Sequence, residues 1–399
     1  MKVTINPQGH ITGTVKAPPS KSMAHRALIC AGLAEGKSVI DNIAASEDIL
    51  ATIDCLRALG AEINYDTEAM RAEVKGTDPA SRGEASLHCR ESGSTLRFML
   101  PLCALSDDPA ALTGSRRLME RPLTIYEDIF RSEGIDLDRS GSSIRVKGRL
   151  TGGDFGMPGD ISSQFVSGLL FTLPLCKEDG LIRLEGKIES RPYIDMTIKA
   201  LNDFGIEVGW KNETDLAVPG SQRYKANDTT IEGDWSNAAN LLALGLEVTG
   251  VDPDSLQGDR VCREYFGQLD EGRAELDIAD CPDLGPVLMA YAALNHGATL
   301  LGTRRLRFKE SDRGNVMREE LAKCGVDVKM SKDSITVGCG VKAPSQMLSG
   351  HNDHRIVMAL AAICARTGGS IEGAEAVSKS FPDYFDKLEG LGIEIRKEQ

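Results

Sequence analysis

The chain has 399 residues and a formal net charge of −13, from 46 Lys and Arg against 59 Asp and Glu. That length predicts two domains rather than one hydrophobic core. The acidic balance argues against nonspecific nucleic-acid binding. No apolar run is long enough to span a bilayer, and Met1–Val15 lacks the apolar core of a signal peptide. We therefore expect a cytoplasmic protein with no membrane contact.

The ten cysteines include no C-x-x-C pair, and most lie in apolar runs. In a long chain without a secretory signal, such cysteines are typical of reduced, buried thiols.

The first notable stretch is Pro18-Pro19-Ser20-Lys21-Ser22, followed by Arg26. The two prolines end an extended segment, and small apolar residues from Ala27 onward predict a buried helix. A first helical turn favours anions, because its N–H groups are free and its dipole end is positive. Two cations in that turn therefore indicate either a bound anion or an ordinary serine-capped helix with solvated cations.

The same pattern then recurs along the chain: an apolar helix, a short strand, a polar loop, and an amphipathic helix that ends at Gly before another strand. Each Gly is the residue expected just after a helix. The units begin near residues 26, 96, 165, 238, 287 and 356, and five of them end in predicted strands at 61–63, 135–137, 206–208, 326–328 and 393–395. The fourth unit is degenerate and shortened between Asn237 and Asp283. Six repeated units predict a pseudosymmetric fold of two domains with three units each, divided within Tyr224–Asp234.

Polar clusters precede the first helix of every unit. Helix capping explains their Ser, Asp and Asn residues, but not Lys21, Arg26, Arg97, Gln164, His354 and Arg355. Cations also gather in the loops inside the units, at 116–121, 191, 309–313 and 379. Their recurrence at equivalent points predicts a cationic cleft for small polyanions, either phosphates or carboxylates.

Two other motifs are set aside. Residues 31–38 fit a relaxed P-loop, but a helix precedes them and a strand follows, which is the reverse of the required order. His351 and His354 lack a partner motif for zinc. We expect no metal and no cofactor.

The order and spacing of several motifs resemble the enolpyruvyl transferase family, and within it the EPSP synthases. The motifs that carry the resemblance are Pro19-Ser20-Lys21-Ser22 with Arg26, residues 92–97, Glu120-Arg121-Pro122, Ser162-Ser163-Gln164, Lys309 to Arg313, Asn352 to Arg355, and 380–385. The resemblance implies an α/β (α+β) fold, a two-domain inverse α/β barrel with three βαβαββ repeats in each domain and the active site in the interdomain cleft. The implied domains are 1–19 with 233–399, on the phosphoenolpyruvate side, and 20–232, on the shikimate 3-phosphate side.

The resemblance also implies the reaction. The enolpyruvyl group of phosphoenolpyruvate moves to the 5-hydroxyl of shikimate 3-phosphate, through a tetrahedral intermediate, and phosphate is released. By position, Asp283 matches the base, Glu310 the acid, and Lys21 a proton-transfer partner. The residues implied for shikimate 3-phosphate are Ser22, Arg26, Ser162, Ser163, Gln164, Ser190, Tyr193, Asp283 and Lys309. Those implied for phosphoenolpyruvate are Lys21, Gly93, Arg121, Gln164, Arg313, Arg355 and Lys379. From the residues alone, Asp283 reads as an ordinary helix cap.

The chain departs from the family pattern at three places. Glu91-Ser92 stands where many relatives have Asn-Ala, Arg305 stands where some have an Asn that touches shikimate, and the fourth unit is short. The nearest alternative is the sister enzyme that acts on UDP-N-acetylglucosamine, which usually has a Cys in the loop that here spans 113–121 without one. An RNA-processing protein or an inactive phospho-ligand-binding homologue on the same repeat is a further alternative. We expect a monomer whose partners are its two small-molecule substrates.

Overall fold

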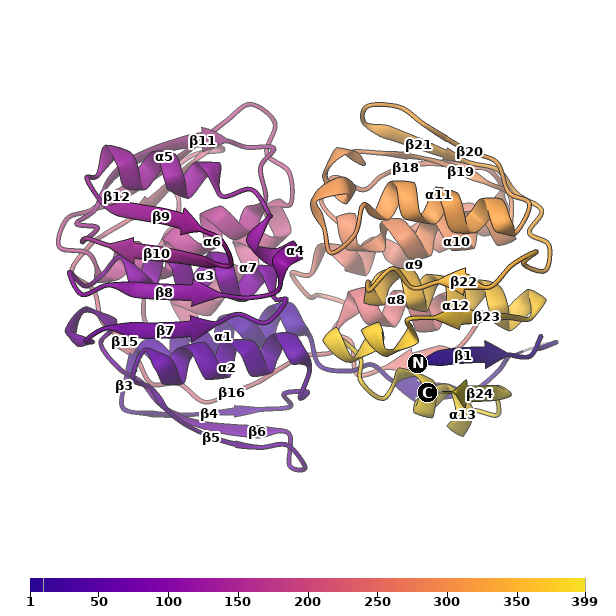
Figure 1. Ribbon diagram of the computed structural model, residues 1–399, viewed down its shortest axis with the longest axis horizontal. Coiled ribbons are helices and arrows are strands. Elements are labelled where there is room, and N and C mark those ends of the chain that lie inside the picture. Colours follow the sequence, from indigo (N-terminus) through magenta and orange to yellow (C-terminus); the bar gives the residue numbers. More distant parts are fainter. Residues whose placement is uncertain (10, 399) are drawn as a thin grey trace. The chain divides into compact units, whose positions relative to one another are not determined.

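The computed structural model describes residues 1–9 and 11–398, which divide into two compact units. Met1–Pro18 and Gly233–Gln399 form one, called here the terminal unit. Pro19–Glu232 forms the other, called here the central unit. Figure 1 shows the elements of each.

The central unit is built from helices and short strands that alternate along the chain. Its helices are α1 (Lys21–Leu33), α2 (Glu47–Ala58), α3 (Gly93–Cys103), α4 (Arg116–Met119), α5 (Thr124–Ser132), α6 (Ser163–Thr172) and α7 (Arg191–Asp203), with 3-10 turns at Pro79–Ser81 and Leu173–Leu175. Its strands are β3 (Ala34–Glu35), β4 (Lys37–Asp41), β5 (Glu62–Asp66), β6 (Arg71–Lys75), β7 (Ala85–His88), β8 (Ala110–Thr113), β9 (Asp136–Ser140), β10 (Ser143–Lys147), β11 (Gly153–Pro158), β12 (Gly180–Glu185), β13 (Gly209–Trp210), β14 (Asp215–Val218), β15 (Tyr224–Lys225) and β16 (Thr229–Thr230).

The terminal unit has the same composition of elements. Its helices are α8 (Trp235–Ala243), α9 (Cys262–Glu271), α10 (Gly285–Leu294), α11 (Arg313–Lys323), α12 (His354–Thr367) and α13 (Tyr384–Gly390), with 3-10 turns at Gly258–Val261, Pro282–Leu284, Arg304–Phe308 and Ala374–Lys379. Its strands are β1 (Lys2–Ile5), β2 (Thr14–Lys16), β17 (Glu247–Thr249), β18 (Ala274–Asp277), β19 (Ala298–Leu301), β20 (Val328–Met330), β21 (Ser334–Val337), β22 (Leu348–Ser349), β23 (Gly369–Glu372) and β24 (Ile395–Glu398).

Five four-stranded sheets share one topology, in which the first two strands are parallel and the other two pairings are antiparallel. In the central unit their orders are β16-β4-β6-β5, β7-β8-β10-β9 and β11-β12-β14-β13, and in the terminal unit they are β18-β19-β21-β20 and β22-β23-β1-β24. This repeated sheet confirms the predicted repeat. The fourth repeat is indeed reduced, because its sheet consists of β2 and β17.

Strands from distant parts of the chain complete two of these sheets. The N-terminal β1 pairs antiparallel with β23 and β24 of the sixth repeat. Strand β16, at the end of the central unit, pairs with β4 of the first repeat. In each unit, therefore, a strand near one end of its sequence pairs with a strand near the other end.

The core of each unit lies between its sheets and its apolar helices. Helices α1, α3 and α6 contribute buried residues along most of their length, as do α8, α10 and α12 in the terminal unit. Helices that are apolar on every side are stable only when buried, so these helices occupy the interior (Figure 1). The polar clusters lie at the N-termini of these helices, which are therefore the candidate positions for functional side chains.

The predicted strands after three of the Gly residues were placed too early. The strands at 206–208, 326–328 and 393–395 begin instead at Gly209, Val328 and Ile395. The residue after each Gly is buried, and its N–H bonds back into the helix, as Ile206 N–H does to the Leu201 carbonyl. This apolar residue therefore closes a Schellman-type helix end, and it is apolar because it packs against the helix, not because it begins the strand.

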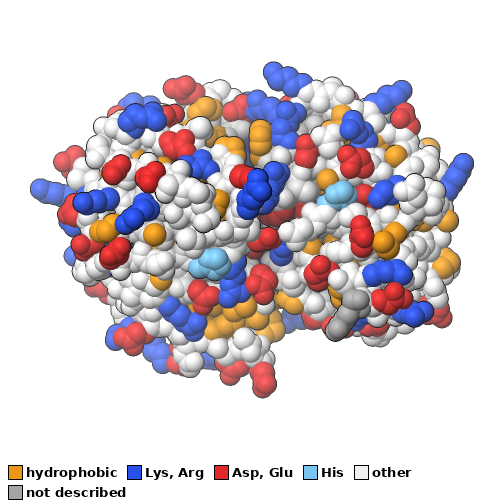
Figure 2. All heavy atoms as spheres, in the orientation of Figure 1, with side chains coloured by type: hydrophobic (Ala, Val, Ile, Leu, Met, Phe, Trp, Pro, Cys, Tyr) orange, Lys and Arg blue, Asp and Glu red, His pale blue; other side chains and the backbone are white. Residues whose placement is uncertain are grey.

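Two other expectations concern the environment of the chain. All ten cysteines are free thiols, and nine of them are buried, as predicted. Over residues 1–9 and 11–398, no helix combines the length and the apolar character needed to cross a membrane. Figure 2 shows acidic and basic side chains interspersed on this face of each unit.

Candidate functional site

Four of the six helix starts are capped as their sequences predict. Ser20, Ser92, Asp234 and Asp353 accept hydrogen bonds from the first turns of α1, α3, α8 and α12. The α6 start at Ser162 has no such side-chain bond. These caps are local, and other polar side chains at the helix starts, such as Lys21, Arg97 and Arg355, contact more distant parts of the chain.

In the central unit, Lys21 lies at the start of α1 beside Asp48, at the start of α2. Lys21 Nζ donates to Asp48 Oδ2 at 2.7 Å, and both side chains are largely buried. Asp48 was not predicted as a site residue. The sequence feature that could have indicated Asp48 is its position in the polar loop that begins the second helix of a repeat. The carboxylate holds the ammonium group in place by a short ion pair.

Arg26 joins α1 to α7 rather than pointing freely into solvent. It donates to the Ser22 carbonyl at 2.7 Å, the Tyr193 carbonyl at 2.8 Å and Thr197 Oγ1 at 2.8 Å. The guanidinium also lies 5.6 Å from the ring centre of Phe98. The structure thus brings together three predicted shikimate 3-phosphate residues, with Arg26 fixing the backbone of the other two.

Gly93 leaves the space that the Arg121 guanidinium occupies. A Cβ at Gly93 would lie 2.2 Å from Arg121 Nη1, which is shorter than any real contact. Gln164 is nearby, since it accepts from Arg97 Nη1 at 2.6 Å and donates to Ser94 Oγ at 2.9 Å. Three predicted residues therefore meet at the starts of α3 and α6. Arg97, whose charge was noted at the sequence level, orients the amide of Gln164.

The serines predicted to bind a phosphate lie at two helix starts. Ser162 and Ser163 open α6, and Ser190 precedes α7. Ser190 has φ of 57°, a left-handed conformation that costs energy for a residue with a side chain. Tyr193 follows in the first turn of α7. Two helix N-termini with hydroxyl groups provide suitable donors for an oxyanion.

His25 belongs to a buried hydrogen-bond chain and not to a metal site. Its Nδ1 lies 2.7 Å from Thr52 Oγ1, which lies 2.7 Å from Thr95 Oγ1. Burial, followed by the charges of Lys21 and Arg26, lowers the pKa of His25 well below its usual value. The ring is therefore neutral at physiological pH.

In the terminal unit, Asp283 is part of a charge network and does not cap α10. It lies in the 3-10 turn Pro282–Leu284, and α10 starts after Leu284 with no side-chain cap. Asp283 Oδ1 accepts from Lys309 Nζ at 3.0 Å and from Arg313 Nη1 at 2.8 Å. The structure thus removes the ordinary helix-cap reading of this residue.

Arg313 is the centre of that network. Its guanidinium is almost completely buried and also donates to Glu310 Oε2 at 2.7 Å and to Asp353 Oδ2 at 2.9 Å. Asp353 in addition accepts from Ser311 Oγ. Asp353 was not predicted as a site residue, although it stands inside the Asn352–Arg355 motif. Both predicted proton-transfer carboxylates therefore share one arginine.

The electrostatics of this network follow from burial and close charges. Burial alone would raise the pKa of Asp283, but Lys309, Arg313 and Arg355 outweigh it and hold that pKa well below the usual range. Burial lowers the pKa of Lys309, against the opposing effect of Asp283. For Arg313, burial is outweighed by Asp353, Glu310 and Asp283, which raise its pKa. Asp283 is therefore ionised and tightly held.

Arg355 and Lys379 lie at the edge of the same network. Arg355 Nη2 is 3.7 Å from Asp283 Oδ2, and its Nη1 donates to Asn237 Oδ1 at 3.3 Å. Arg355 Nε is buried without a hydrogen-bond partner among the described residues. Lys379 Nζ donates to the Asn352 carbonyl at 2.6 Å. A buried guanidinium nitrogen such as Arg355 Nε, without a partner among the described residues, is a donor suited to an anionic ligand.

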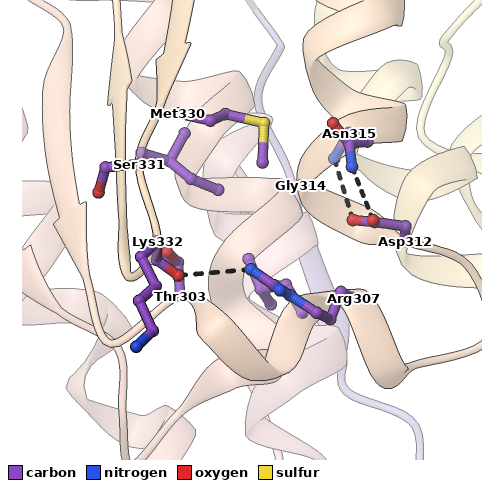
Figure 3. A pocket seen from close by; sticks show the side chains of 10 residues that line it. Thr303, Arg307, Asp312, Gly314, Asn315, Met330, Ser331 and Lys332 are labelled. Atoms are coloured by element: carbon purple, nitrogen blue, oxygen red, sulfur yellow. Dashed lines mark hydrogen bonds between the residues drawn. The ribbon is translucent and has the colours of Figure 1, made fainter.

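The pocket in Figure 3 lies at the start of α11, where Asp312 and Gly314 flank Arg313 in the chain. It has a volume of about 300 Å³, and its walls include Arg307, Asp312, Gly314, Met330 and Lys332. Asn315 and Asp312 face each other there and are hydrogen-bonded at 2.7 Å. None of the predicted site residues lines it. The neighbouring Arg305, which departs from the family pattern, donates to the Ala279 carbonyl.

The repeated four-stranded sheets, with hydroxyls, lysines and arginines at the starts of the apolar helices, agree with the fold expected of an enolpyruvyl transferase. The family model for EPSP synthase (3-phosphoshikimate 1-carboxyvinyltransferase) matches residues 5–388. The chain therefore belongs to the EPSP synthase family, the 3-phosphoshikimate 1-carboxyvinyltransferases.

Relatives and solved structures agree with that membership. The chain is 40% identical to the 3-phosphoshikimate 1-carboxyvinyltransferase of Clostridium kluyveri over 420 residues, covering 98% of each chain. It is 38% identical to that of Clostridium perfringens (strain 13 / Type A) over 428 residues, covering all of both chains. EPSP synthase from Acinetobacter baumannii superposes with a TM-score of 0.80 at 21% identity over both full chains, which confirms the predicted fold.

Proposed function

We propose that this chain transfers the enolpyruvyl group of phosphoenolpyruvate to the 5-hydroxyl of shikimate 3-phosphate, giving 5-enolpyruvylshikimate 3-phosphate and phosphate. In the shikimate pathway to chorismate this is the sixth step. One observation carries the proposal beyond family membership: Arg313 holds both Asp283 and Glu310 at hydrogen-bond distance. The reaction needs one proton removed and one delivered, and two carboxylates with different partners suit that need.

Each carboxylate has its own task in the proposal. Asp283 accepts the proton of the attacking hydroxyl, and Glu310 delivers a proton to the methylene carbon of phosphoenolpyruvate. Lys21 contacts phosphoenolpyruvate and takes part in proton transfer. The tetrahedral intermediate then loses phosphate from its central carbon and a proton from the new methyl group, which re-forms the carbon–carbon double bond. Glu310, a carboxylate after its first proton transfer, takes that proton back.

The low pKa of Asp283 bears on its task as a base. A carboxylate paired with Lys309, Arg313 and Arg355 is ionised but weakly basic. When an anionic substrate draws those cations toward itself, their hold on Asp283 weakens and its pKa rises. The carboxylate then becomes a stronger base in the substrate complex, when the proton has to be moved.

The two substrates use different helix starts in this proposal. Shikimate 3-phosphate is bound by hydroxyls and cations at the starts of α1, α6 and α7. The residues proposed to bind it are Ser22, Arg26, Ser162, Ser163, Gln164, Ser190 and Tyr193 in the central unit, and Asp283 and Lys309 in the terminal unit. Phosphoenolpyruvate is bound by Lys21, Gly93, Arg121 and Gln164, with Arg313, Arg355 and Lys379. The proposed domains are 1–19 with 233–399 and 20–232.

The test is release of inorganic phosphate from phosphoenolpyruvate and shikimate 3-phosphate without added metal. Asp283→Asn and Glu310→Gln are expected to lower kcat by about 10²–10⁴-fold with smaller changes in substrate binding. Asp327→Asn, which removes an exposed carboxylate of the same unit, is the control and is expected to leave kcat unchanged. Release that requires UDP-N-acetylglucosamine would overturn the assignment. Weaker binding at unchanged kcat would overturn the acid and base roles.

We further propose a cytoplasmic monomer. Size-exclusion chromatography with light scattering tests the oligomeric state, and cell fractionation tests the location.

A further inference from the structure

A second buried carboxylate, Glu320, lies two turns along α11 from Arg313. Its side chain is 1% exposed, yet both oxygens are satisfied. Oε1 accepts from Lys323 Nζ at 2.9 Å and from His351 Nε2 at 2.8 Å. Oε2 accepts from Lys323 Nζ at 2.9 Å and from the Ser349 N–H at 3.0 Å. Glu320 therefore attaches α11 to the segment that precedes α12.

That segment has a costly backbone conformation. His351 and Asn352 are consecutive non-glycine residues with φ of 47° and 54°, in the left-handed region. The turn is also closely packed, because a Cβ at Gly350 would lie 2.5 Å from Val357 Cγ2. Strained backbone persists only when surrounding contacts hold it. The bond from His351 to Glu320 is one such contact.

The strained turn delivers a specific atom to the proposed phosphoenolpyruvate site. With its φ of 54°, Asn352 presents its carbonyl to Lys379 Nζ at 2.6 Å. The next residue, Asp353, holds Arg313. A relaxed turn would move the Asn352 carbonyl and remove this hydrogen bond, so the long lysine side chain would be held less firmly in its present rotamer.

We propose that Glu320 and His351 are positioning residues for Lys379, acting through the left-handed turn at 351–352. Neither touches substrate in this proposal. Glu320 anchors the His351 ring, the ring holds the turn, and the turn's carbonyl orients the ammonium group for phosphoenolpyruvate. The inference rests on the proposed role of Lys379.

His351→Phe tests the proposal, since it removes the donor and keeps a ring, while His351→Gln keeps a donor. Both replace a side chain that is 28% exposed, and both have the same difficulty with positive φ. His351→Phe is expected to raise the KM for phosphoenolpyruvate about tenfold, the scale of one hydrogen bond to a charged group, with the KM for shikimate 3-phosphate unchanged. His351→Gln is expected to stay within about twofold of the wild type.

Glu320→Gln and Glu319→Gln form a matched pair on adjacent positions of α11. Glu319 is exposed, so its variant is expected to show wild-type kinetics. Glu320→Gln is expected to raise the KM for phosphoenolpyruvate in the same direction as His351→Phe. An equal rise in both KM values, or a lower melting temperature with both KM values unchanged, would show a merely structural role and overturn the proposal.

Lys379→Met separates this inference from the proposed function. If Lys379→Met leaves the KM for phosphoenolpyruvate unchanged, the assignment of Lys379 itself is wrong. If it raises that KM, His351→Phe in the Lys379→Met background is expected to add nothing further, because the two act in series. A full additional tenfold effect in that background would overturn the positioning role while leaving the assignment of Lys379 intact.

Discussion

Replacing Gly93 by Ala provides the sharpest test of the site residues proposed in the central unit. The added Cβ would lie 2.2 Å from Arg121 Nη1 and 3.4 Å from Arg121 Cζ. Because ordinary contacts of this kind are about 3.4 Å or longer, the guanidinium has to shift by roughly 1 Å. The clash is with the end of a flexible side chain, so the backbone can stay in place.

The expected magnitudes differ for binding and for stability. In the proposed site, a displaced guanidinium would lose charged hydrogen bonds to phosphoenolpyruvate, each contributing about 1.5–3 kcal/mol. The KM for phosphoenolpyruvate is therefore expected to rise about ten- to 150-fold. The free energy of unfolding is expected to change by less than about 1 kcal/mol, because Ala favours the helix that Gly93 begins.

The assay is steady-state phosphate release with each substrate varied in turn. Gly267→Ala is the matched control, since Gly267 lies in α9 and a Cβ there would meet nothing within 4 Å. Its kinetics are expected to match the wild type. In an Arg121→Met background, Gly93→Ala is expected to have little further effect on the KM for phosphoenolpyruvate.

Two results would refute the reasoning. One is an unchanged KM for phosphoenolpyruvate in a folded Gly93→Ala protein. The other is an undiminished effect of Gly93→Ala when Arg121 is already absent, because the effect would then not pass through the guanidinium.

Three further predictions concern stability. Asp353→Asn removes the charge that Arg313 contacts in the buried network, so urea unfolding is expected to show a free energy of unfolding lower by about 2–4 kcal/mol. The control Asp386→Asn, at an exposed carboxylate, is expected to change that free energy by less than about 0.5 kcal/mol. Equal losses in the two variants would contradict a stabilising role of the network. Folding lowers the pKa of His25, so on acidification the unfolded chain takes up a proton that the folded chain does not. The free energy of unfolding is therefore expected to fall by up to about 1.4 kcal/mol per pH unit below about pH 6.5. His25→Asn should flatten the plot of unfolding free energy against pH between pH 7 and 5, and an unaltered slope of that plot would contradict a neutral ring. Folding also lowers the pKa of Asp283, so its stabilising effect is present above the unfolded-state pKa of about 3.9 and is lost as pH falls through the folded value. The difference in unfolding free energy between the wild type and Asp283→Asn should be constant from pH 7 to about 5 and shrink below about pH 4. A difference that grows on acidification would contradict a lowered pKa.

Local signals explain why so much of the fold could be predicted from the sequence. Helix starts carry their own caps, as Ser20 and Asp353 do, and helix ends carry glycine. The same locality explains the error in the strands after Gly205, Gly325 and Gly392. An apolar residue that closes a helix end looks like the first residue of a strand in the sequence. The structure shows that the residue after each of these Gly residues donates its N–H back into the helix, as Ala61 and Ile135 also do.

Contacts between distant residues account for what the sequence did not reveal about the site. Asp283 and Arg313 are 30 residues apart, and Arg313 and Asp353 are 40 apart, yet they form one network. Nothing near Asp283 in the sequence distinguishes a helix cap from a carboxylate held by cations. Lys21 and Asp48 likewise meet only because α1 packs beside α2.

The sequence by itself determined the repeat, the helix starts and the excess of cations at those starts, because capping, helix periodicity and glycine termination depend on neighbouring residues. The tertiary structure alone decided which charges pair and that Arg355 Nε has no hydrogen-bond partner among the described residues. It also decided that Arg26 braces two helices and that the turn at 351–352 is held in a strained conformation. These properties depend on burial and on distances between segments far apart in the chain, where a low dielectric makes each pairing strong and each unpaired group costly.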